Sequence, residues 1–434
     1  DSCLIFTKSY LAMQAMQCFT KGYVIVANGA TPEDVWAAGH IAESLRWPLV
    51  ADVGSRLHFG HSTFASVSAR YFDQVLLLED VKELVAPDVV LQIGSHITSK
   101  RISNLISSSP LQMYAMVSAI DARLDPLHAV THRVVMPPAT FLDCIGFEDP
   151  RWEILAKRRQ CFLDVVQRLS HKVEEAVVDW MNSAEEDRLE GQEAKLTEMQ
   201  VAFTIAKLLP RDSSMFLGNS MPIRDFDMYA NQMSSTNADA GEGEYRSEGS
   251  ALGPAVAVNR GASGIDGIIS AASGYAVGNC SPVTLVIGDV SFAYDCNGLM
   301  LLRDRPQQQP VVVVVINNGG GRIFDLLPVA KTLSNSTMKS FFHTPPGINI
   351  KLLARAYDLA YRDVDSCEGL KSALKQAWYE KRHSILEVRT NGDESPSQRK
   401  KLQQAILEAL KLISSFVPKA AATGEKVPLA SRAV

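Results

Sequence analysis

The sequence lacks the features of several common protein classes. Its seven cysteines are an odd number and include no Cys-x-x-Cys pair, so we expect neither a disulfide framework nor a cysteine zinc site. No segment approaches the ~20 apolar residues of a transmembrane helix, so we expect no membrane partner. Lysine and arginine total 43 against 48 acidic residues, giving a net charge of −5. Because nucleic-acid-binding proteins are usually basic, we also expect no nucleic-acid partner.

Two catalytic signatures are missing as well. The sequence has no Gly-x-Ser-x-Gly elbow, on which many hydrolases carry their nucleophile. No Gly-x-Gly-x-x-Gly fingerprint of dinucleotide-binding enzymes follows an early apolar run. These absences argue against a hydrolase and against a dehydrogenase.

What is present predicts two α/β units. The 434 residues, 46% of them hydrophobic, are enough for two or three domains. Short apolar runs alternate with helical patterns, which favours doubly wound parallel sheets. Strands are predicted at residues 23–27, 48–52, 88–94 and 111–117, and later at 215–217, 256–258, 283–287, 311–316 and 384–389. We predict an α/β domain over residues 1–149, a helical connector over 150–195, a second α/β domain over 196–392, and a C-terminal helix with a loose tail over 393–434. A polar stretch over 234–253 is expected to be an exposed loop.

The most informative segment lies in the second unit. Gly288 and Asp289 close one buried, β-branched run, and Asn317 and Asn318 close the next, followed by three glycines. Ligands of open α/β sheets bind beyond the carboxyl ends of such strands. A carboxylate, an amide oxygen and glycine backbone suit a hard cation that carries a diphosphate, because Mg²⁺ takes one or two carboxylates together with phosphate oxygens.

This pattern resembles the cofactor motif of thiamine diphosphate enzymes, in which a Gly-Asp pair is followed by Asn about one βα unit later. Three further segments, residues 218–225, 259–267 and 320–328, resemble one branch of that superfamily. The branch is 2-succinyl-5-enolpyruvyl-6-hydroxy-3-cyclohexene-1-carboxylate (SEPHCHC) synthase of menaquinone and phylloquinone biosynthesis. The order of motifs agrees over most of the chain.

The resemblance implies an activity. Such enzymes are transferases that decarboxylate 2-oxoglutarate and add the resulting succinic-semialdehyde carbanion to isochorismate, with thiamine diphosphate and Mg²⁺ (or Mn²⁺) as cofactors. The family has three α/β domains, and the two units here resemble the central and the diphosphate-binding domains. The aminopyrimidine-binding domain, which carries the glutamate that activates the cofactor, has no counterpart in this sequence. We therefore expect this chain by itself to be inactive or nearly so.

The resemblance also assigns roles to residues around the cofactor. Asp289, the side-chain oxygen of Asn318 and the carbonyl of Gly320 would hold the metal, with Asn317 as the competing choice for the amide. Gly288 and Ser291 would lie at the diphosphate. Ile265 would be the bulky residue that bends the cofactor.

Substrate roles follow in the same way. Both substrates are dianions, and arginine suits carboxylates because its guanidinium makes bidentate hydrogen bonds. Apolar side chains near the reactive carbon would exclude water. The matched positions are Lys100, Arg101, Arg224 and Arg260 for the cations, Ser220 for a hydroxyl donor, and Ile323, Phe324 and Leu327 for the apolar wall.

Alternatives remain at this stage. An enzyme resembling acetolactate synthase would decarboxylate pyruvate in place of 2-oxoglutarate. A non-catalytic module would bind cofactor and act through assembly with another polypeptide. The resemblance further implies at least a homodimer for the complete protein. A chloroplast location is expected if the source is a plant or alga, where this module resembles part of a longer fused polypeptide, and a cytoplasmic location otherwise.

Overall fold

The computed structural model describes residues 19–60, 64–122, 124–144, 151–189, 196–210, 212–231, 252–305 and 308–414. These residues form two compact units. Unit 1 holds the described residues within Asp1–Ala176, together with Leu252 and the residues from Ala405 onward, and unit 2 holds those within Val177–Met233 and Gly253–Gln404. The polar stretch predicted as a loop lies outside the described residues except for its last two positions, and so does the tail beyond residue 414.

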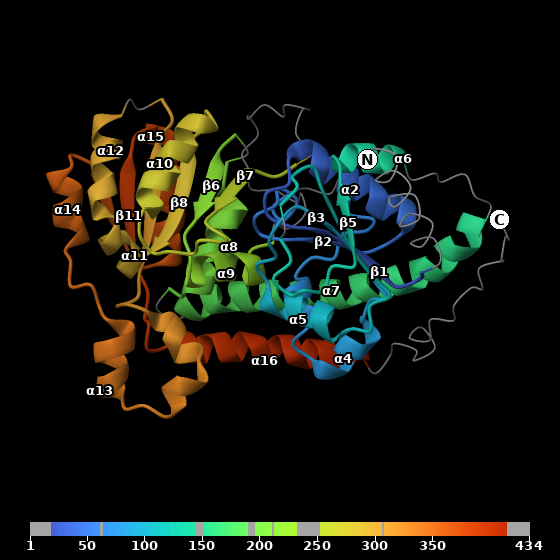
Figure 1. Cartoon of the computed structure of the whole chain (residues 1–434). Coiled ribbons are helices and arrows are strands. Elements are labelled where there is room, and N and C mark those ends of the chain that lie inside the picture. The colour runs from blue at the N-terminus through green and yellow to red at the C-terminus, as the bar shows by residue number, and fades with distance from the viewer. Residues whose placement is uncertain are drawn as a thin grey trace. The chain divides into compact units, whose positions relative to one another are not determined.

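Unit 1 is built on a five-stranded parallel sheet in the order β2-β1-β3-β4-β5 (Figure 1). Its strands are β1 (Gly22–Val26), β2 (Leu49–Ala51), β3 (Val89–Ile93), β4 (Met113–Ser118) and β5 (His132–Val135). Its helices are α2 (Pro32–Leu45), α3 (Phe72–Val75), α4 (Glu79–Leu84), α5 (Lys100–Ser108) and α6 (Pro138–Cys144). β1 and β3 are buried along their whole length, as expected for central strands covered on both faces.

Local sequence signals explain where α2 begins. The Thr31 hydroxyl accepts a hydrogen bond from the N–H of Asp34 at 3.2 Å, and the Asp34 carboxylate accepts one from the N–H of Thr31 at 3.0 Å. Pro32 occupies the first helical position, where its missing N–H costs nothing. The helix then packs its buried face on the core around Trp47, which is fully buried.

Unit 2 is built on a six-stranded parallel sheet in the order β10-β11-β9-β8-β6-β7. Its strands are β6 (Ser214–Leu217), β7 (Ala255–Val258), β8 (Val283–Gly288), β9 (Val311–Asn317), β10 (Ala360–Val364) and β11 (Ser384–Arg389). β8 and β9 are central, and their apolar residues are buried throughout. Both sheets alternate strand and helix, which confirms the predicted α/β class.

The helices of unit 2 cover both faces of its sheet. They are α8 (Glu198–Leu208), α9 (Met221–Tyr229), α10 (Ile268–Gly278), α11 (Asp289–Tyr294), α12 (Leu299–Asp304), α13 (Asn335–Met338), α14 (Ile350–Ala356) and α15 (Cys367–Glu380). Short 3₁₀ segments occur at Cys296–Gly298, Arg322–Leu326 and Pro328–Lys331, and a π-helical turn at Lys339–His343.

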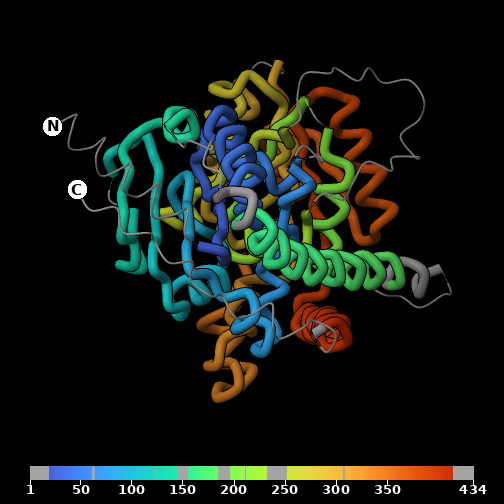
Figure 2. Tube along the Cα trace, turned by 90° about the vertical axis from the view of Figure 1, so that its right-hand side faces the viewer, coloured from blue at the N-terminus to red at the C-terminus, as the bar shows by residue number. Residues whose placement is uncertain are grey.

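Two long helices contribute residues to both units. α7 (Arg151–Leu189) lies within the stretch 150–195 and is seen as one continuous helix in Figure 2. α16 (Ser395–Ser414) follows β11 and begins within unit 2. Among the described helices, none has the length and apolar character that a membrane crossing requires.

The strand order of unit 2 contains a topological switch point. The chain leaves β6 toward β7 on one side, and it leaves β8 toward β9 on the other side. The connections therefore diverge between β6 and β8, and ligands of open α/β sheets bind at such a switch point, beyond the carboxyl ends of the strands. The segment after β6 begins at Gly218, and the segment after β8 begins at Asp289.

Two strands were missed in the sequence. β5 and β10 are the outer strands of their sheets, and only one residue of each is buried. An edge strand has solvent on one side, so it lacks the continuous apolar run that marks a central strand.

Candidate functional site

Asp289 lies at the carboxyl end of β8 and is almost completely buried, with 2% of its surface exposed. Its Oδ1 accepts a hydrogen bond from the N–H of Val290 at 2.8 Å, and its Oδ2 accepts one from the N–H of Gly320 at 2.8 Å. Burial raises the pKa of Asp289, and these N–H groups act in the opposite direction. This second hydrogen bond links the carboxylate at the end of β8 to the glycine turn after β9, which consists of residues 319–321.

At position 320 the backbone of the glycine turn can accommodate only glycine. Its φ is +121°, and a Cβ there would lie 2.2 Å from the carbonyl oxygen of His343. The Gly320 carbonyl accepts a hydrogen bond from the N–H of Arg322 at 2.8 Å, which leaves its second lone pair available. The turn therefore brings backbone polar groups close to Asp289, as a phosphate-bearing cation would need.

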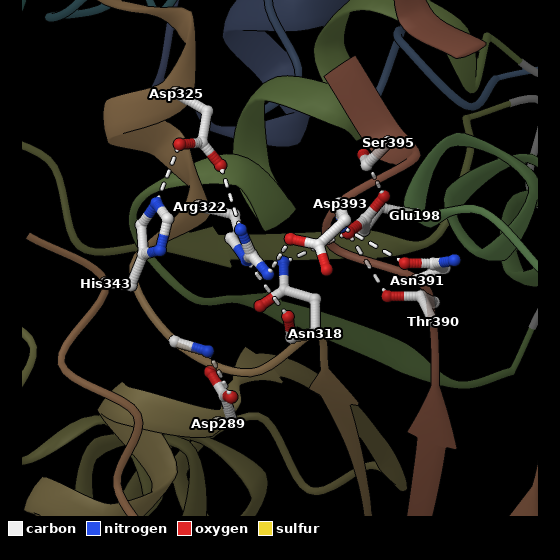
Figure 3. Close-up of polar contacts among 11 residues, drawn as sticks. Glu198, Asp289, Asn318, Arg322, Asp325, His343, Thr390, Asn391, Asp393 and Ser395 are labelled. Atoms are coloured by element: carbon white, nitrogen blue, oxygen red, sulfur yellow. Dashed lines mark hydrogen bonds and ion pairs between the residues drawn. The ribbon is translucent and has the colours of Figure 1, made fainter. Parts of the chain in front are cut away.

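The two asparagines at the end of β9 are each held by a different buried carboxylate. The side-chain amide of Asn317 donates to Glu387 on β11 at 2.7 Å. The side-chain amide of Asn318 donates to Glu198, at the start of α8, at 3.0 Å (Figure 3). Glu198 is 3% exposed. In both residues the nitrogen is occupied, so a side-chain oxygen remains to accept or to coordinate.

Metal ligation by Asp289, Asn318 and Gly320 stays a prediction, but the residues fit it. In the described ranges, no group of three or more His, Cys, Asp or Glu residues is suited to a metal. The predicted set is of a different kind, because it contains only one carboxylate. One buried carboxylate, one amide oxygen and one carbonyl match the oxygen ligands of Mg²⁺, which completes its shell with phosphate and water.

A second cluster lies after β6, on the strand next to β8. Ser220 adopts φ 72° and ψ −129°, a backbone conformation that non-glycine residues rarely take. Its carbonyl accepts a hydrogen bond from the Arg224 guanidinium at 2.5 Å. Such strained residues concentrate at ligand sites, where the surrounding structure holds them in place.

Arg224 and Arg260 lie close enough to affect each other electrostatically. Burial lowers the pKa of Arg224, and the positive charge of Arg260 lowers it further. The Nε of Arg260 is buried and has no hydrogen-bond partner among the described residues. The carboxylates of Asp225 and Asp227 raise the pKa of Arg224 and so partly offset these effects. The buried Nε of Arg260 remains suited to an anionic acceptor.

The loop after β7 reaches the same place. The side-chain amide of Asn219 donates to the carbonyl of Gly264 at 2.7 Å, which ties residues 259–267 to the end of β6. Ile265 follows directly and is half-buried. Ser291, 5% exposed, lies two residues after Asp289 on α11. The cofactor roles of Ile265 and Ser291 remain predictions.

The predicted apolar wall lies on the segment after the glycine turn. Ile323 and Phe324 are half-buried and Leu327 is 45% exposed. Phe324 packs edge-on against Phe342 with ring centroids 5.4 Å apart. Residues 323–327 therefore present partly exposed apolar side chains that a ligand could contact.

A polar network that the sequence did not reveal holds this segment (Figure 3). Arg322 donates to the carbonyl of Asn318 at 3.3 Å, to Asp325 at 3.3 Å and to Asp393 at 2.6 Å. His343 contacts the other oxygen of Asp325 at 2.7 Å. His343 and Asp393 lie 18 and 71 positions from their partners in this network, so no local spacing marks them.

The remaining predicted cations belong to unit 1. Lys100 is exposed at the first position of α5, and Arg101 follows it. The Arg101 guanidinium is paired with the buried carboxylate of Asp73 at 2.5 Å. Their substrate roles are not tested by the structure of unit 1.

Two domain families of known proteins match most of this chain. The middle domain of thiamine pyrophosphate enzymes matches residues 7–217, and their C-terminal thiamine pyrophosphate-binding domain matches residues 252–388. This chain belongs to the thiamine pyrophosphate enzymes. The two matched domains correspond to the central and diphosphate-binding units expected from the sequence.

Individual relatives within these enzymes are more specific. The chain is 35% identical over 385 residues to Protein PHYLLO, chloroplastic, of Arabidopsis thaliana, covering 87% of this chain and 22% of that protein. It is 33% identical over 377 residues to the SEPHCHC synthase of Salinibacter ruber, covering 86% of this chain and 57% of that enzyme. A similar match, 31% identical, is found with the SEPHCHC synthase of Chlorobium phaeobacteroides. The chain therefore spans somewhat more than half of the length of these bacterial synthases.

A solved structure supports the fold. A thiamin diphosphate-dependent enzyme from Mycobacterium smegmatis superposes with a TM-score of 0.54 at 15% identity, covering 89% of this chain and 64% of that one. At this identity the likeness establishes the architecture alone. Together with the two domain matches, it confirms two parallel-sheet domains of the thiamine diphosphate enzyme type.

Proposed function

We propose that this chain forms part of a SEPHCHC synthase, a thiamine diphosphate-dependent carboligase that joins a succinyl unit from 2-oxoglutarate to isochorismate. The relatives that bear this name support the proposal. The observation that carries it is the pair Arg224, which follows β6, and Arg260, which follows β7, with a buried Arg260 Nε that has no hydrogen-bond partner among the described residues. A carboxylate of the substrate would accept a hydrogen bond from the Nε of Arg260.

In this proposal the end of β8 and the glycine turn hold the cofactor. Asp289, the Asn318 side-chain oxygen and the Gly320 carbonyl bind a Mg²⁺ or Mn²⁺ ion that carries the diphosphate, beside Gly288 and Ser291. Ile265 supports the bent shape of the cofactor. When bound, thiamine diphosphate supplies the electron sink that decarboxylation of a 2-oxo acid requires.

The protein contributes binding, orientation and exclusion of water. Arg224 and Arg260 bind carboxylates of the substrate through charge-assisted hydrogen bonds, and Ser220 adds a hydroxyl donor. Ile323, Phe324 and Leu327 present an apolar surface that keeps water from the reacting carbon. Lys100 and Arg101 are proposed to bind the second dianion, isochorismate.

A substitution of Arg260 tests the substrate assignment. Arg260→Lys keeps the charge but removes the planar fork, and one charge-assisted hydrogen bond contributes about 1.5–3 kcal/mol. The dissociation constant for 2-oxoglutarate, measured by calorimetry with thiamine diphosphate and Mg²⁺ present, is expected to rise about tenfold to a hundredfold.

The matched control is Arg355→Lys, on the exposed side of α14, which is expected to leave the affinity for 2-oxoglutarate unchanged. Unchanged binding in Arg260→Lys would contradict the proposal. Pyruvate binding as tightly as 2-oxoglutarate would instead favour an enzyme of the acetolactate synthase type.

We also propose that these 434 residues need a separate aminopyrimidine-binding domain for turnover. Loss of a positioned acid–base group alone typically costs ~10²–10⁴ in rate. Turnover of isochorismate and 2-oxoglutarate is measured with the chain alone and with that domain of a bacterial relative added as a second polypeptide. Activity only in the mixture is the expected result, and full activity of the chain alone would refute it.

Two further expectations belong to the same proposal. The complete protein forms at least a homodimer, and, if its source is a plant or alga, it resides in the chloroplast, as the name of the Arabidopsis relative states for that protein. Sedimentation of the reconstituted protein and imaging of a fluorescent fusion in the source cells test these two statements. A monomer with full activity would contradict the first, and cytosolic fluorescence the second.

A further inference from the structure

Glu198 is a buried carboxylate at which three separate segments meet (Figure 3). Its Oε1 accepts hydrogen bonds from the side-chain amide of Asn318 at 3.0 Å and from the hydroxyl of Thr390 at 3.1 Å. Its Oε2 accepts one from the hydroxyl of Ser395. Asn318 follows β9, Thr390 follows β11 and Ser395 begins α16. One side chain therefore joins the ends of two strands to the start of a helix.

Helix capping does not account for Glu198. α8 already carries a complete capping box, in which Thr197 and Gln200 satisfy each other's N–H groups at 3.3 and 3.1 Å. Burying a carboxylate is costly unless it is hydrogen-bonded. The three donors meet this requirement, and they all lie outside α8.

The charge of Glu198 also acts on a buried cation. Arg399 of α16 is 5% exposed and pairs with Asp225 at 2.5 Å. Burial lowers the pKa of Arg399, but the charges of Asp225 and Glu198 contribute to holding it above its usual value. Glu198 is therefore part of a buried charge network behind the site, which fixes its position.

The chemistry of a carboxylate fixes the orientation of the Asn318 amide. An ionised carboxylate only accepts hydrogen bonds, so the amide must turn its NH₂ group toward Glu198. The amide oxygen then points away from Glu198, and within the described ranges no hydrogen bond to it is found. We infer that Glu198 is a positioning residue, which holds the Asn318 oxygen ready for the divalent cation. The inference rests on the proposed function, because it needs a cation at Asp289.

The neighbouring asparagine provides an internal comparison. Asn317 donates to Glu387 at 2.7 Å, and Glu387 also accepts from Tyr361 at 2.6 Å. This pair lies toward β11 and the edge strand β10, whereas β8 with Asp289 lies on the other side of β9. Glu387 thus orients an amide in the same manner, but within the half of the sheet that lacks Asp289.

The test compares Glu198→Gln with Glu387→Gln. Glutamine has nearly the same shape but carries its own NH₂ group, so it no longer forces the asparagine amide into one orientation. Mn²⁺ affinity is measured by electron paramagnetic resonance in the presence of thiamine diphosphate, on the chain complemented with an aminopyrimidine-binding domain. Replacing a residue that hydrogen-bonds to a metal ligand typically lowers the metal affinity 10–100-fold.

We expect Glu198→Gln to weaken Mn²⁺ binding at least about tenfold and Glu387→Gln to leave it unchanged, with both variants keeping the wild-type circular dichroism spectrum. Equal Mn²⁺ affinity in Glu198→Gln and wild type overturns the inference. A loss in Glu387→Gln alone overturns it too and assigns the ligand to Asn317. Absence of Mn²⁺ binding in the wild type refutes the proposed function itself, which is a different result.

A second variant covers the case in which Glu198→Gln does not fold. Thr390→Val removes one donor to Glu198 without adding a new one, and it is nearly isosteric. Its Mn²⁺ affinity is expected to fall by a smaller factor, about threefold, because Asn318 and Ser395 still hold the carboxylate. Wild-type affinity in Thr390→Val, with Glu198→Gln unfolded, overturns the inference.

Discussion

Breaking the buried ion pair between Arg399 and Asp225 should destabilise unit 2. The guanidinium of Arg399 on α16 lies 2.5 Å from Oδ1 of Asp225 on α9, and the two side chains are 6% and 1% exposed. Arg399 also lies over the ring of Tyr229, 5.6 Å from its centroid. We expect Arg399→Met, which keeps much of the apolar stem, to leave an uncompensated buried carboxylate.

The magnitude follows from what remains after the substitution. Removing one partner of a buried pair typically costs 3–5 kcal/mol, because the other charge stays buried. Oδ2 of Asp225 already has no hydrogen-bond partner among the described residues. We therefore expect the free energy of unfolding of unit 2 to fall by about 3–5 kcal/mol at neutral pH.

The loss should depend on pH in a defined direction. Burial raises the pKa of Asp225 from 3.8 to about 6, with Arg399 acting in the opposite direction. The folded chain therefore binds the proton more tightly than the unfolded chain, and the stability contribution of Asp225 declines as pH rises from about 4 to about 6. Without Arg399 the pKa rises further, so the deficit of Arg399→Met should be smallest near pH 4 and largest above about pH 7.

Urea unfolding followed by circular dichroism at pH 4.5 and pH 7.5 measures this deficit, with separate transitions fitted for the two units. Lys400→Met, at the exposed next position of α16, is the control and should change stability little. The double variant Asp225→Asn with Arg399→Met should recover much of the loss. A pH-independent deficit, or one below about 1 kcal/mol, would refute the assignment of a buried, paired charge.

Three further substitutions have expected outcomes. Gly320→Ala places a Cβ 2.2 Å from the carbonyl oxygen of His343 at φ +121°, so thiamine diphosphate binding measured by calorimetry should be lost, with strain of about 1–3 kcal/mol or more. Gly22→Ala drives a Cβ to within 2.2 Å of the Trp47 ring and should lower the unfolding free energy of unit 1 by about 1–3 kcal/mol in urea titrations. Arg159→Met removes a fully buried guanidinium that lies 5.3 Å from the centroid of the same ring, and a destabilisation of about 1–3 kcal/mol is expected in the same assay.

Matched controls keep these outcomes interpretable. Gly278→Ala, at the end of α10, meets no atom within 4 Å and should be neutral for both stability and cofactor binding. Lys157→Met lies at an exposed position of α7 and should leave the stability of unit 1 unchanged. If either control destabilised the protein as much as its test variant, close packing would not be the cause.

Several features of the fold followed from the sequence because they depend on short-range chemistry. β8 and β9 are continuous β-branched runs, and a strand buried on both faces needs such a run. Thr31 and Pro32 start α2 through bonds made within one turn. Asp289 was found because a carboxylate directly after a central strand lies where ligands of these sheets bind.

The partners of the site residues could not be obtained in this way. Glu198 follows a capping threonine, so in the sequence it resembles an ordinary first-turn acid, and only the fold brings it to Asn318 across 120 positions of the chain. Arg399 and Asp225 are 174 positions apart. Charged side chains have no periodic signature, because most of them are solvated and their pairing depends on which elements meet.

The sequence by itself determined the class of the fold, its central strands and the acid at the mouth of the second sheet, since backbone propensity and hydrophobic burial act over a few neighbouring residues. The tertiary structure decided the edge strands β5 and β10, the carboxylate that holds each asparagine, and the buried Arg260 Nε that has no partner in the part of the chain that the structure describes. These features depend on contacts between distant segments, and such contacts exist only after the sheet has formed and its loops have met above it.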